Sequence, residues 1–436
     1  MKTVVLFGAG KSATVLISYL LKEAENNNWQ IIIADSNKDI IEQKTKLHPS
    51  SEAVEVDITD TDKRHFIIKK ADVVISMMPA SLHILIAQDC IEFKKNLLTA
   101  SYVDENIKAL NEKAVEAGIL FLCEMGLDPG IDHMSAMKIF DEIKEEGGKV
   151  TSFKSHCGGL VAPESDDNPW RYKISWNPRN VVLAGKSGAV YLKDAKEVTE
   201  DYEQLFSSNR ELEIDQKEYS YYPNRNSLSY IDLYSLHDVK TFVRTTLRYP
   251  EFMSGWDKII KLKLTDEVAK YDTEGLSLES FFINHFKENN LSELFLQLND
   301  DYFKEQMYFF GLKDNSTFIN KGFCSAADVM QFILETKLPL LNNDKDLVVM
   351  CHEVEYTVNE KRKLVTSSLC VKGNDSMHTA MAKTVGLPLG IATKLLLEGK
   401  IKLTGVHIPV NKEIYLQVLK ELEKNDIIFS ESTINI

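Results

Sequence analysis

The stretch Thr3-Val4-Val5-Leu6-Phe7-Gly8-Ala9-Gly10-Lys11-Ser12-Ala13 decides the fold of the first part of the chain. It opens with a short apolar run, which is typical of a buried strand. The remainder has the form GxGxxA, whose glycines permit a tight turn and a close backbone approach to a pyrophosphate. The start of a following helix supplies free N–H groups and the positive end of a dipole. This context predicts a dinucleotide-binding loop at Gly8, Ala9, Gly10, Lys11, Ser12 and Ala13, with a ligand-free turn as the alternative.

Apolar runs alternate with amphipathic helical segments up to about residue 125. The predicted strands are Thr3–Phe7, Ile31–Ala34, Ala53–Asp57, Asp72–Ser76, Leu97–Ala100 and Ile119–Cys123. The predicted helices include Thr14–Glu25 and Asp104–Ala117. Short buried strands separated by helices form parallel βαβ units whose sheet is covered on both faces. The sequence therefore predicts an α/β fold with a Rossmann-type dinucleotide-binding domain.

Acidic side chains follow the second and third predicted strands. Asp35 is placed to accept hydrogen bonds from both hydroxyls of an adenosine ribose, and its charge would repel a 2′-phosphate. The next residues, Ser36 and Asn37, are neutral, and the nearest cation along the chain is Lys38. We therefore expect NAD to be preferred over NADP, with a solvated turn as the alternative for Asp35. Asp57 is expected near the adenine, or as a turn carboxylate.

Polar residues also follow the later predicted strands, at the edge where open α/β sheets bind their ligands. The segment Ser76–Pro79 is expected near the nicotinamide half of a cofactor, with a simple loop as the alternative. Ser101 and Tyr102 follow the fifth predicted strand, and Glu124–His133 follows the sixth. Within that last segment, Asp128 and His133 can form an acid–base pair. The alternative is that His133 only helps to begin the next helix.

The second part of the chain is richer in Gly, Pro, Tyr and Trp and predicts an α+β domain. Its predicted strands are Val150–His156, Val181–Leu183, Thr241–Leu247, Leu347–Val354 and Lys363–Val371. Residues 257–345 form a predicted helical insertion that includes Leu278–Lys287 and Ala326–Glu335, and a long helix is predicted over Met377–Glu398. The predicted boundaries are residues 1–129, rejoined by about 395–436, then 130–256 with 346–394, and the insertion 257–345.

Two arginines in this part suggest an anionic ligand. Arg225 and Arg248 stand in short motifs of a chain that is otherwise acidic. A guanidinium can hold a carboxylate through two parallel hydrogen bonds, although ordinary ion pairs remain the alternative. The segment Cys351–Glu355 resembles a metal cluster, but strand alternation sends Cys351 and Glu353 to one face and His352 to the other. We therefore expect a structural strand there and no metal site.

Composition excludes several classes of protein. The chain has 436 residues, and 51 basic against 65 acidic side chains give a net charge of −14, which disfavours binding to nucleic acid. No uncharged apolar stretch of about 18 residues is present, so no membrane span is expected. The six cysteines contain no CxxC pair, and such scattered thiols suit a reducing compartment. We therefore expect a cytoplasmic location.

Five longer motifs resemble the L-glutamate-forming saccharopine dehydrogenases, also called saccharopine reductases. They are GLDPGIDHMSA from residue 126, SHCGGLVAPESDDNPWRYKISWNPR from 155, YPNRNS from 222, TTLRY from 245 and MAKTVGLPLGIATKLLLEGKI from 381. The resemblance implies a variant Rossmann domain, an α+β substrate-binding and dimerisation domain, and a small helical insertion. It also implies a homodimer.

The resemblance further implies the reaction and the residues that serve it. Such enzymes use NAD or NADP and water to oxidise saccharopine to L-glutamate and 2-aminoadipate 6-semialdehyde, in lysine metabolism. The implied cofactor positions are Gly8, Ala9, Gly10, Lys11, Ser12, Ala13, Asp35, Ser36, Asn37, Asp57, Ile58, Met78, Ala100, Ser101, Leu127, Asp128 and Asn177. The implied substrate positions are Ser101, Tyr102, Asp128, Arg225, Thr246, Leu247 and Arg248. Asp128 and Tyr102 are the candidate acid–base residues.

Two alternative functions stay open at this point. One is a reductive condensation enzyme of the carboxynorspermidine or homospermidine type, whose diamine substrate would call for acids where Arg225 and Arg248 stand. The other is a non-catalytic dinucleotide-binding sensor, which would need the glycine-rich loop but not the arginines.

Overall fold

A computed structural model describes residues 1–207 and 210–436. The chain divides into two compact units, 1–149 with 377–430 and 150–376 with 431–436. The first boundary lies after the predicted one at residue 129, because the helix that follows it belongs to the first unit. The return to that unit begins at residue 377, before the predicted position near 395, because the long helix also belongs there.

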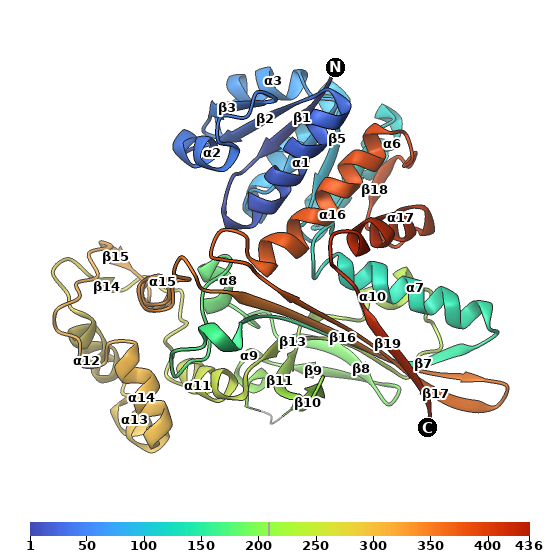
Figure 1. Cartoon of the computed structure of the whole chain (residues 1–436). Coiled ribbons are helices and arrows are strands. Elements are labelled where there is room, and N and C mark those ends of the chain that lie inside the picture. The colour runs from blue at the N-terminus through green and yellow to red at the C-terminus, as the bar shows by residue number, and fades with distance from the viewer. Residues whose placement is uncertain (208–209) are drawn as a thin grey trace. The chain divides into compact units, whose positions relative to one another are not determined.

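The first unit is built on a seven-stranded parallel sheet (Figure 1), and it confirms the predicted α/β class. In spatial order its strands are β18 (Gly405–His407), β6 (Leu120–Leu122), β5 (Asn96–Thr99), β4 (Val73–Ser76), β1 (Lys2–Phe7), β2 (Trp29–Asp35) and β3 (Ser51–Glu55). Its α-helices are α1 (Thr14–Asn27), α2 (Lys38–Thr45), α3 (Thr61–Lys69), α4 (His83–Phe93), α5 (Glu105–Lys108), α6 (Asn111–Ala117), α7 (Ile131–Glu145), α16 (Ala380–Leu397) and α17 (Lys412–Glu423). The predicted helix Asp104–Ala117 is thus two helices, α5 and α6.

Alternation along β1 explains why both faces of this sheet are covered. Val5 and Phe7 pack with buried side chains of α3, α4 and α6. Val4 and Leu6 are fully buried on the opposite face. On the helical side of the unit, α1 and α16 lie side by side (Figure 1), and a Cβ at Gly386 would lie 2.9 Å from the backbone nitrogen of Leu16. The helix α16 is therefore part of this core although it is far away in the sequence.

The second unit contains a ten-stranded mixed sheet. Its strands are β7 (Lys149–Val161), β8 (Ala189–Lys193), β9 (Lys196–Glu200), β10 (Glu211–Ile214), β11 (Lys217–Pro223), β12 (Arg225–Asn226), β13 (Thr241–Arg248), β16 (Asp346–Val358), β17 (Lys361–Lys372) and β19 (Ser430–Asn435). Its α-helices are α8 (Pro178–Val182), α9 (Tyr202–Leu205), α10 (Ser229–Leu233), α11 (Pro250–Lys261), α12 (Leu278–Glu288), α13 (Ser292–Leu298), α14 (Asp301–Phe309) and α15 (Ala326–Lys337). The segment Cys351–Glu355 lies within β16, as predicted.

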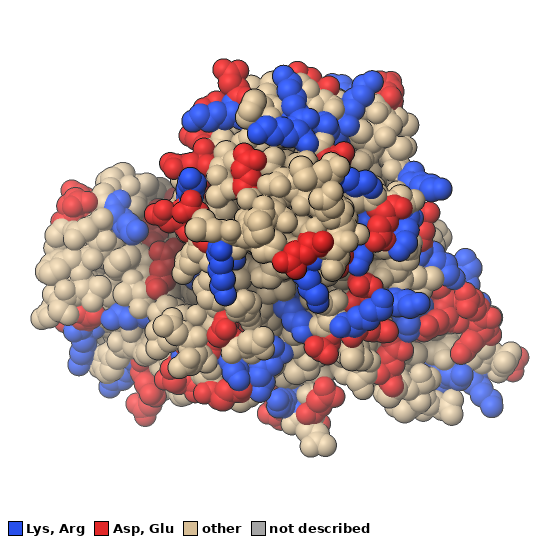
Figure 2. Space-filling model, turned by 45° about the horizontal axis from the view of Figure 1, so that its top comes forward, with Lys and Arg blue, Asp and Glu red and all other residues tan. Residues whose placement is uncertain are grey.

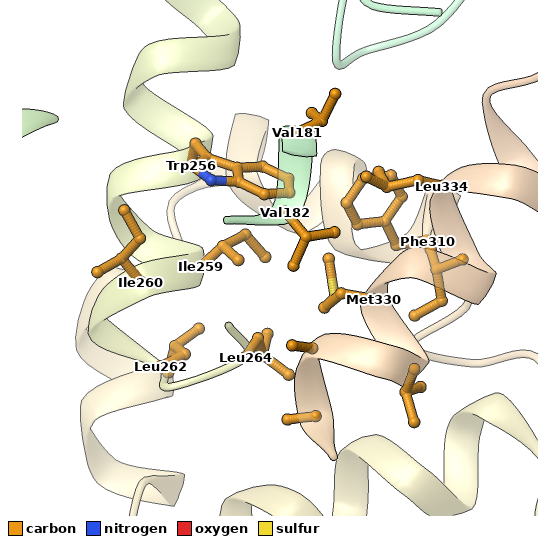
Figure 3. Close-up of a cluster of buried hydrophobic side chains, with 14 of the residues drawn as sticks. Val181, Val182, Trp256, Ile259, Ile260, Leu262, Leu264, Phe310, Met330 and Leu334 are labelled. Carbon is orange, nitrogen blue, oxygen red and sulfur yellow. The ribbon is translucent and has the colours of Figure 1, made fainter. Parts of the chain in front are cut away.

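The helical part of the second unit surrounds an apolar cluster (Figure 3). Trp256 and Ile259 of α11, Phe310 after α14 and Met330 of α15 are all fully buried there. The short pair β14 (Tyr271–Asp272) and β15 (Phe323–Cys324) lies in the same part of the chain. The helices of residues 257–345 bury their apolar faces in this core, which explains the Leu- and Phe-rich helical pattern of that sequence.

The prediction of a strand over Val181–Leu183 was wrong, because Val181 and Val182 are the last residues of α8 and Leu183 is its C-cap. The Asn177 side chain accepts a hydrogen bond from the backbone N–H of Arg179, and Pro178 occupies the first turn. An Asn cap followed by proline is a helix start signal. Val181 and Val182 are fully buried in the apolar cluster (Figure 3), so their β-branched shape serves packing rather than strand pairing.

The long helix α16 is strongly apolar. The helix α16 is the one described helix long and apolar enough to cross a membrane by length and composition, yet 78% of it is buried inside the structure. Such burial is typical of a core helix.

On most of the face shown in Figure 2, acidic and basic side chains are interspersed. They are not gathered into a basic stripe of the kind that tracks a nucleic-acid backbone.

Candidate functional site in the dinucleotide-binding unit

The glycine-rich loop connects β1 to the short 3-10 helix η1 (Lys11–Ala13). Gly8 has φ +95°, and a Cβ there would meet the carbonyl oxygen of Met77 at 2.9 Å, so this position requires glycine. Gly10 has an ordinary φ of −62°, and no atom lies within 4 Å of where its Cβ would be. The first glycine therefore serves the turn, and the second leaves open space beside the backbone.

The N–H groups of this loop are available to an anion. Among the described residues, no acceptor is hydrogen-bonded to the N–H groups of Gly10, Lys11 or Ser12. Free consecutive N–H groups at the start of a helix form a concavity that binds phosphate. The residues present therefore fit the pyrophosphate of a dinucleotide.

Asp35 lies at the end of β2, beside the loop, where the sequence predicted it. Its Oδ2 accepts the N–H of Ala9 at 2.7 Å, and its Oδ1 accepts the N–H of Asn37 at 3.0 Å. The side chain of Asn37 accepts the N–H groups of Asp39 and Ile40 and thereby caps α2. Asp35 thus orders both the loop and the start of α2, while Ser36 is exposed.

Lys44 is a loop residue that sequence reasoning missed. It lies in the last turn of α2, and its ammonium donates to the carbonyl oxygens of Ala9 at 2.7 Å and Gly10 at 2.6 Å. Burial lowers the pKa of Lys44 to about 8, and the Asp35 carboxylate opposes part of that shift. A lysine this far along the chain could have been found only by knowing how α2 folds back over the loop.

Asp57 and Ile58 follow β3 at the same edge of the sheet. Asp57 is exposed and accepts the backbone N–H of Thr59 at 2.9 Å and its hydroxyl at 2.8 Å; these hydrogen bonds lower the pKa of Asp57. The carbonyl of Ile58 accepts from the Arg64 guanidinium at 2.7 Å, and Arg64 forms a buried ion pair with Asp89. This turn is therefore fixed from two sides.

His83 joins the ends of two strands and was not predicted. Its Nδ1 lies 2.8 Å from Oγ of Ser76, at the end of β4, and its Nε2 lies 2.7 Å from Oγ of Ser101, after β5. The hydroxyl of Thr99 accepts the N–H of Ser101 at 3.2 Å. Burial lowers the pKa of His83 to about 4, so its ring is neutral at pH 7. The orientation of the predicted ligand residue Ser101 is thus set by a buried imidazole.

The structure brings the two candidate acid–base residues together. The Tyr102 hydroxyl donates to Oδ1 of Asp128 across 3.4 Å, and both side chains are half-buried. His133 instead lies in the first turn of α7, fully buried, with its Nε2 2.8 Å from a carboxylate oxygen of Glu124. His133 therefore has Glu124 as a close, buried partner.

The remaining predicted cofactor residues lie in different places. Met78 and Ala100 follow β4 and β5 and are half-buried, and Leu127 is buried in the turn before α7. Asn177 belongs to the second unit, where its side chain caps α8. The first three therefore lie at the carboxyl edge of the first sheet with the glycine-rich loop.

Arg248 is the most informative of the predicted substrate residues. It ends β13, is 3% exposed, and lies over the rings of Tyr172 at 5.5 Å and Phe252 at 5.6 Å. Among the described residues, its guanidinium makes one hydrogen bond, to the carbonyl of Leu247 at 2.8 Å, and its Nε has no partner. No carboxylate of the described residues forms an ion pair with it. A buried guanidinium without a counter-ion is costly unless an anion binds there.

The other predicted substrate residues of the second unit differ in their burial and in the strand face that they occupy. Thr246 shares the strand face of Arg248, but Leu247 points to the opposite face and packs with Tyr249. Arg225 is exposed in β12, with φ +54°. Leu247 is therefore a core residue, and only its backbone shares the site of Arg248.

Two family models match successive parts of the chain. Residues 4–122 match the family model described as "Saccharopine dehydrogenase NADP binding domain". Residues 126–428 match the model described as "Saccharopine dehydrogenase C-terminal domain".

Two curated relatives show how much of each chain is shared. The chain is 33% identical to saccharopine dehydrogenase [NADP(+), L-glutamate-forming] of Saccharomyces cerevisiae, over 99% of both chains. It is 36% identical to alpha-aminoadipic semialdehyde synthase of Arabidopsis thaliana, over 85% of this chain but only 38% of that protein's length.

A solved structure agrees with this assignment. The apo form of histidine-tagged saccharopine dehydrogenase (L-Glu forming) from Saccharomyces cerevisiae matches with a TM-score of 0.88 and 31% identity, over 100% of both chains. Together, the matched models, the full-length relative and the shared fold establish that the chain belongs to the saccharopine dehydrogenase family.

Proposed function

We propose that this chain uses NAD and water to oxidise saccharopine at its secondary amine, giving L-glutamate and 2-aminoadipate 6-semialdehyde. Family membership and the names of the yeast and plant relatives support this activity. The observation that carries it within this chain is Arg248, a buried guanidinium that forms no ion pair with any residue that the structure describes. Saccharopine has three carboxylates, and such a cation is built to receive one.

The first unit supplies the cofactor side of the reaction. The N–H groups of Gly10, Lys11 and Ser12 would hold the pyrophosphate, and Asp35 would hold the adenosine ribose. When bound, the nicotinamide accepts hydride from the substrate carbon that carries the secondary amine. The buried bridge from His83 to Ser101 keeps that hydroxyl in one orientation at the same sheet edge.

Proton transfer falls to the pair of Tyr102 and Asp128. Water must add to the imine that the oxidation leaves, and the nitrogen must be protonated as the C–N bond breaks. The Asp128 carboxylate, which accepts from the Tyr102 hydroxyl, can receive a proton from water. The tyrosine then keeps the carboxylate oriented.

We also propose that NAD is preferred over NADP. The description of the matched dinucleotide-binding family model and the name of the yeast relative both refer to NADP. This chain, however, has Asp35 where the ribose is expected. A 2′-phosphate would meet that carboxylate as a like charge, which costs several kcal/mol at a partly buried site. The neighbouring Ser36 and Asn37 carry no cation to offset it.

The decisive experiment replaces Arg248 by methionine and follows reduced-cofactor absorbance with saccharopine and NAD. We expect the KM for saccharopine to rise roughly 10- to 100-fold, because a hydrogen bond to a charged group contributes about 1.5–3 kcal/mol. The dissociation constant of NADH should not change. Arg362→Met is the matched control, since Arg362 lies in the same unit, is 62% exposed and pairs with Glu355.

The stability of the variant separates a binding role from a structural one. Removing a buried, unpaired charge should leave the melting temperature unchanged or raise it. A lower melting temperature with an unchanged KM would show that Arg248 serves the fold instead. Oxidation of a polyamine in place of saccharopine would support the condensation enzyme. Normal NADH binding without oxidation of any amine would support the sensor.

Two further properties stay proposals. We propose a homodimer, to be tested by light scattering after size-exclusion chromatography. We propose a cytoplasmic location, to be tested by fractionation of the source cells.

A further inference from the structure

Lys44 makes contacts that a solvated helix residue would not make. Its ammonium donates to two consecutive loop carbonyls, those of Ala9 and Gly10, at 2.7 and 2.6 Å. Asp35 holds the N–H of Ala9 at 2.7 Å from the other side of the same residue. The loop backbone is therefore clamped by one cation and one anion.

This clamp decides which backbone groups of the loop are free. Carbonyl and phosphate oxygens both carry negative charge, so a loop that turned its carbonyls toward a pyrophosphate would repel it. Lys44 stabilises the arrangement in which the carbonyls of Ala9 and Gly10 are occupied. In that arrangement the N–H groups of Gly10, Lys11 and Ser12 remain without acceptors among the described residues.

We propose that Lys44 is a positioning residue for dinucleotide binding, which fixes the glycine-rich loop in its pyrophosphate-binding form. It rests on the proposed function only in assuming a dinucleotide, not in assuming saccharopine. Both NAD and NADP carry the pyrophosphate, so Lys44 serves the two cofactors equally. A lysine that contacted a 2′-phosphate would instead favour NADP alone.

The test compares Lys44→Met, Lys44→Arg and the control Lys38→Met. Lys38 lies on the same helix, is 48% exposed and pairs with Glu42 at 3.4 Å. Dissociation constants for NADH and NADPH are measured by fluorescence titration without saccharopine. Because these titrations contain no substrate, inactivity toward saccharopine would leave their result intact.

We expect Lys44→Met to weaken NADH and NADPH by the same factor, about tenfold or more, since two charge-assisted hydrogen bonds are lost. Lys44→Arg should recover most of the affinity, and Lys38→Met should bind normally. At saturating cofactor, the KM for saccharopine should be unchanged.

Two outcomes would overturn the proposal. Unchanged NADH affinity in Lys44→Met would show that the clamp does not matter, and loss of NADPH alone would make Lys44 a phosphate contact. If Lys44→Met does not fold, Lys44→Gln decides, because its shorter, neutral side chain keeps a polar end but loses the two charge-assisted hydrogen bonds. Equal and partial loss of both cofactors in that variant supports the proposal, and full affinity contradicts it.

Discussion

Gly10 is needed for the ligand and not for the fold, because its backbone conformation and surroundings would accept a side chain in the absence of a cofactor. Its φ of −62° suits any residue, and nothing lies within 4 Å of where a Cβ would be. We expect Gly10→Ala to keep the melting temperature within about 1 °C, since no neighbour must move. The added methyl should nevertheless raise the NADH dissociation constant about tenfold or more, because the pyrophosphate must approach this backbone.

Calorimetry and fluorescence titration on the same sample check this prediction. A variant that melts normally and still binds NADH tightly would show that the pyrophosphate does not approach Gly10. Gly8→Ala is the contrasting variant, because its left-handed φ and its 2.9 Å contact with Met77 predict a loss of stability.

Asp35 determines the expected cofactor choice, and its neighbours decide which variant can reverse it. We expect at least about a tenfold higher kcat/KM with NAD than with NADP, since each 1.4 kcal/mol of repulsion is tenfold. Asp35→Ser combined with Ser36→Arg should invert that ratio. Ser36 is the better site for the arginine, because Asn37 caps α2 and its loss would cost about 1 kcal/mol.

Steady-state kinetics with both cofactors tests the ratio directly. The single variant Asn37→Ala is the control, which should lower stability without changing the ratio. Equal efficiency with NAD and NADP in the unmodified chain would contradict the role given to Asp35.

At the scale of elements, α4 begins at a buried histidine that ties β4 to the segment after β5. The pKa of His83 is lowered to about 4, whereas in the unfolded chain histidine titrates near 6.5. Between these values the unfolded state binds more protons, so the free energy of unfolding falls as the pH drops from about 6.5 to about 4. We expect His83→Gln to flatten this dependence, because glutamine does not titrate.

Thermal melting between pH 7 and pH 5 measures that difference. The unmodified protein should lose stability faster than His83→Gln by up to about 1.4 kcal/mol per pH unit. His237→Gln, at a side chain that is 68% exposed, is the control and should follow the unmodified protein. Parallel curves for His83→Gln would show that His83 does not stay neutral in the fold.

The helices and strands also show how much could be predicted from the sequence. Local signals sufficed for β1, the glycine-rich loop and Asp35, because strand, turn and acid lie within one βαβ unit. They failed at α8, where Val181 and Val182 resemble a strand but follow the cap Asn177 and Pro178. Lys44 and His83 could not be predicted, because their partners are set by how α2 and α4 pack over the sheet.

At the scale of the whole chain, α16 completes a core that begins at α1. A Cβ at Gly386 would meet the nitrogen of Leu16 at 2.9 Å and its Cβ at 3.1 Å. We expect Gly386→Ala to lower the free energy of unfolding of the first unit by about 1–3 kcal/mol, as overpacking does. Denaturant unfolding measures this loss, with Gly10→Ala as the glycine control. Unchanged stability would show that α1 and α16 can move apart without cost.

The return of α16 to the first unit has a consequence for how the protein is made. The strands β1 to β6 leave the ribosome early, but the face of α1 that α16 covers stays bare until residues 380–397 have been synthesised. At about 5–20 residues per second, that delay is on the order of tens of seconds. During that interval the nascent first unit exposes apolar surface, which makes it a candidate client for chaperones that act on growing chains.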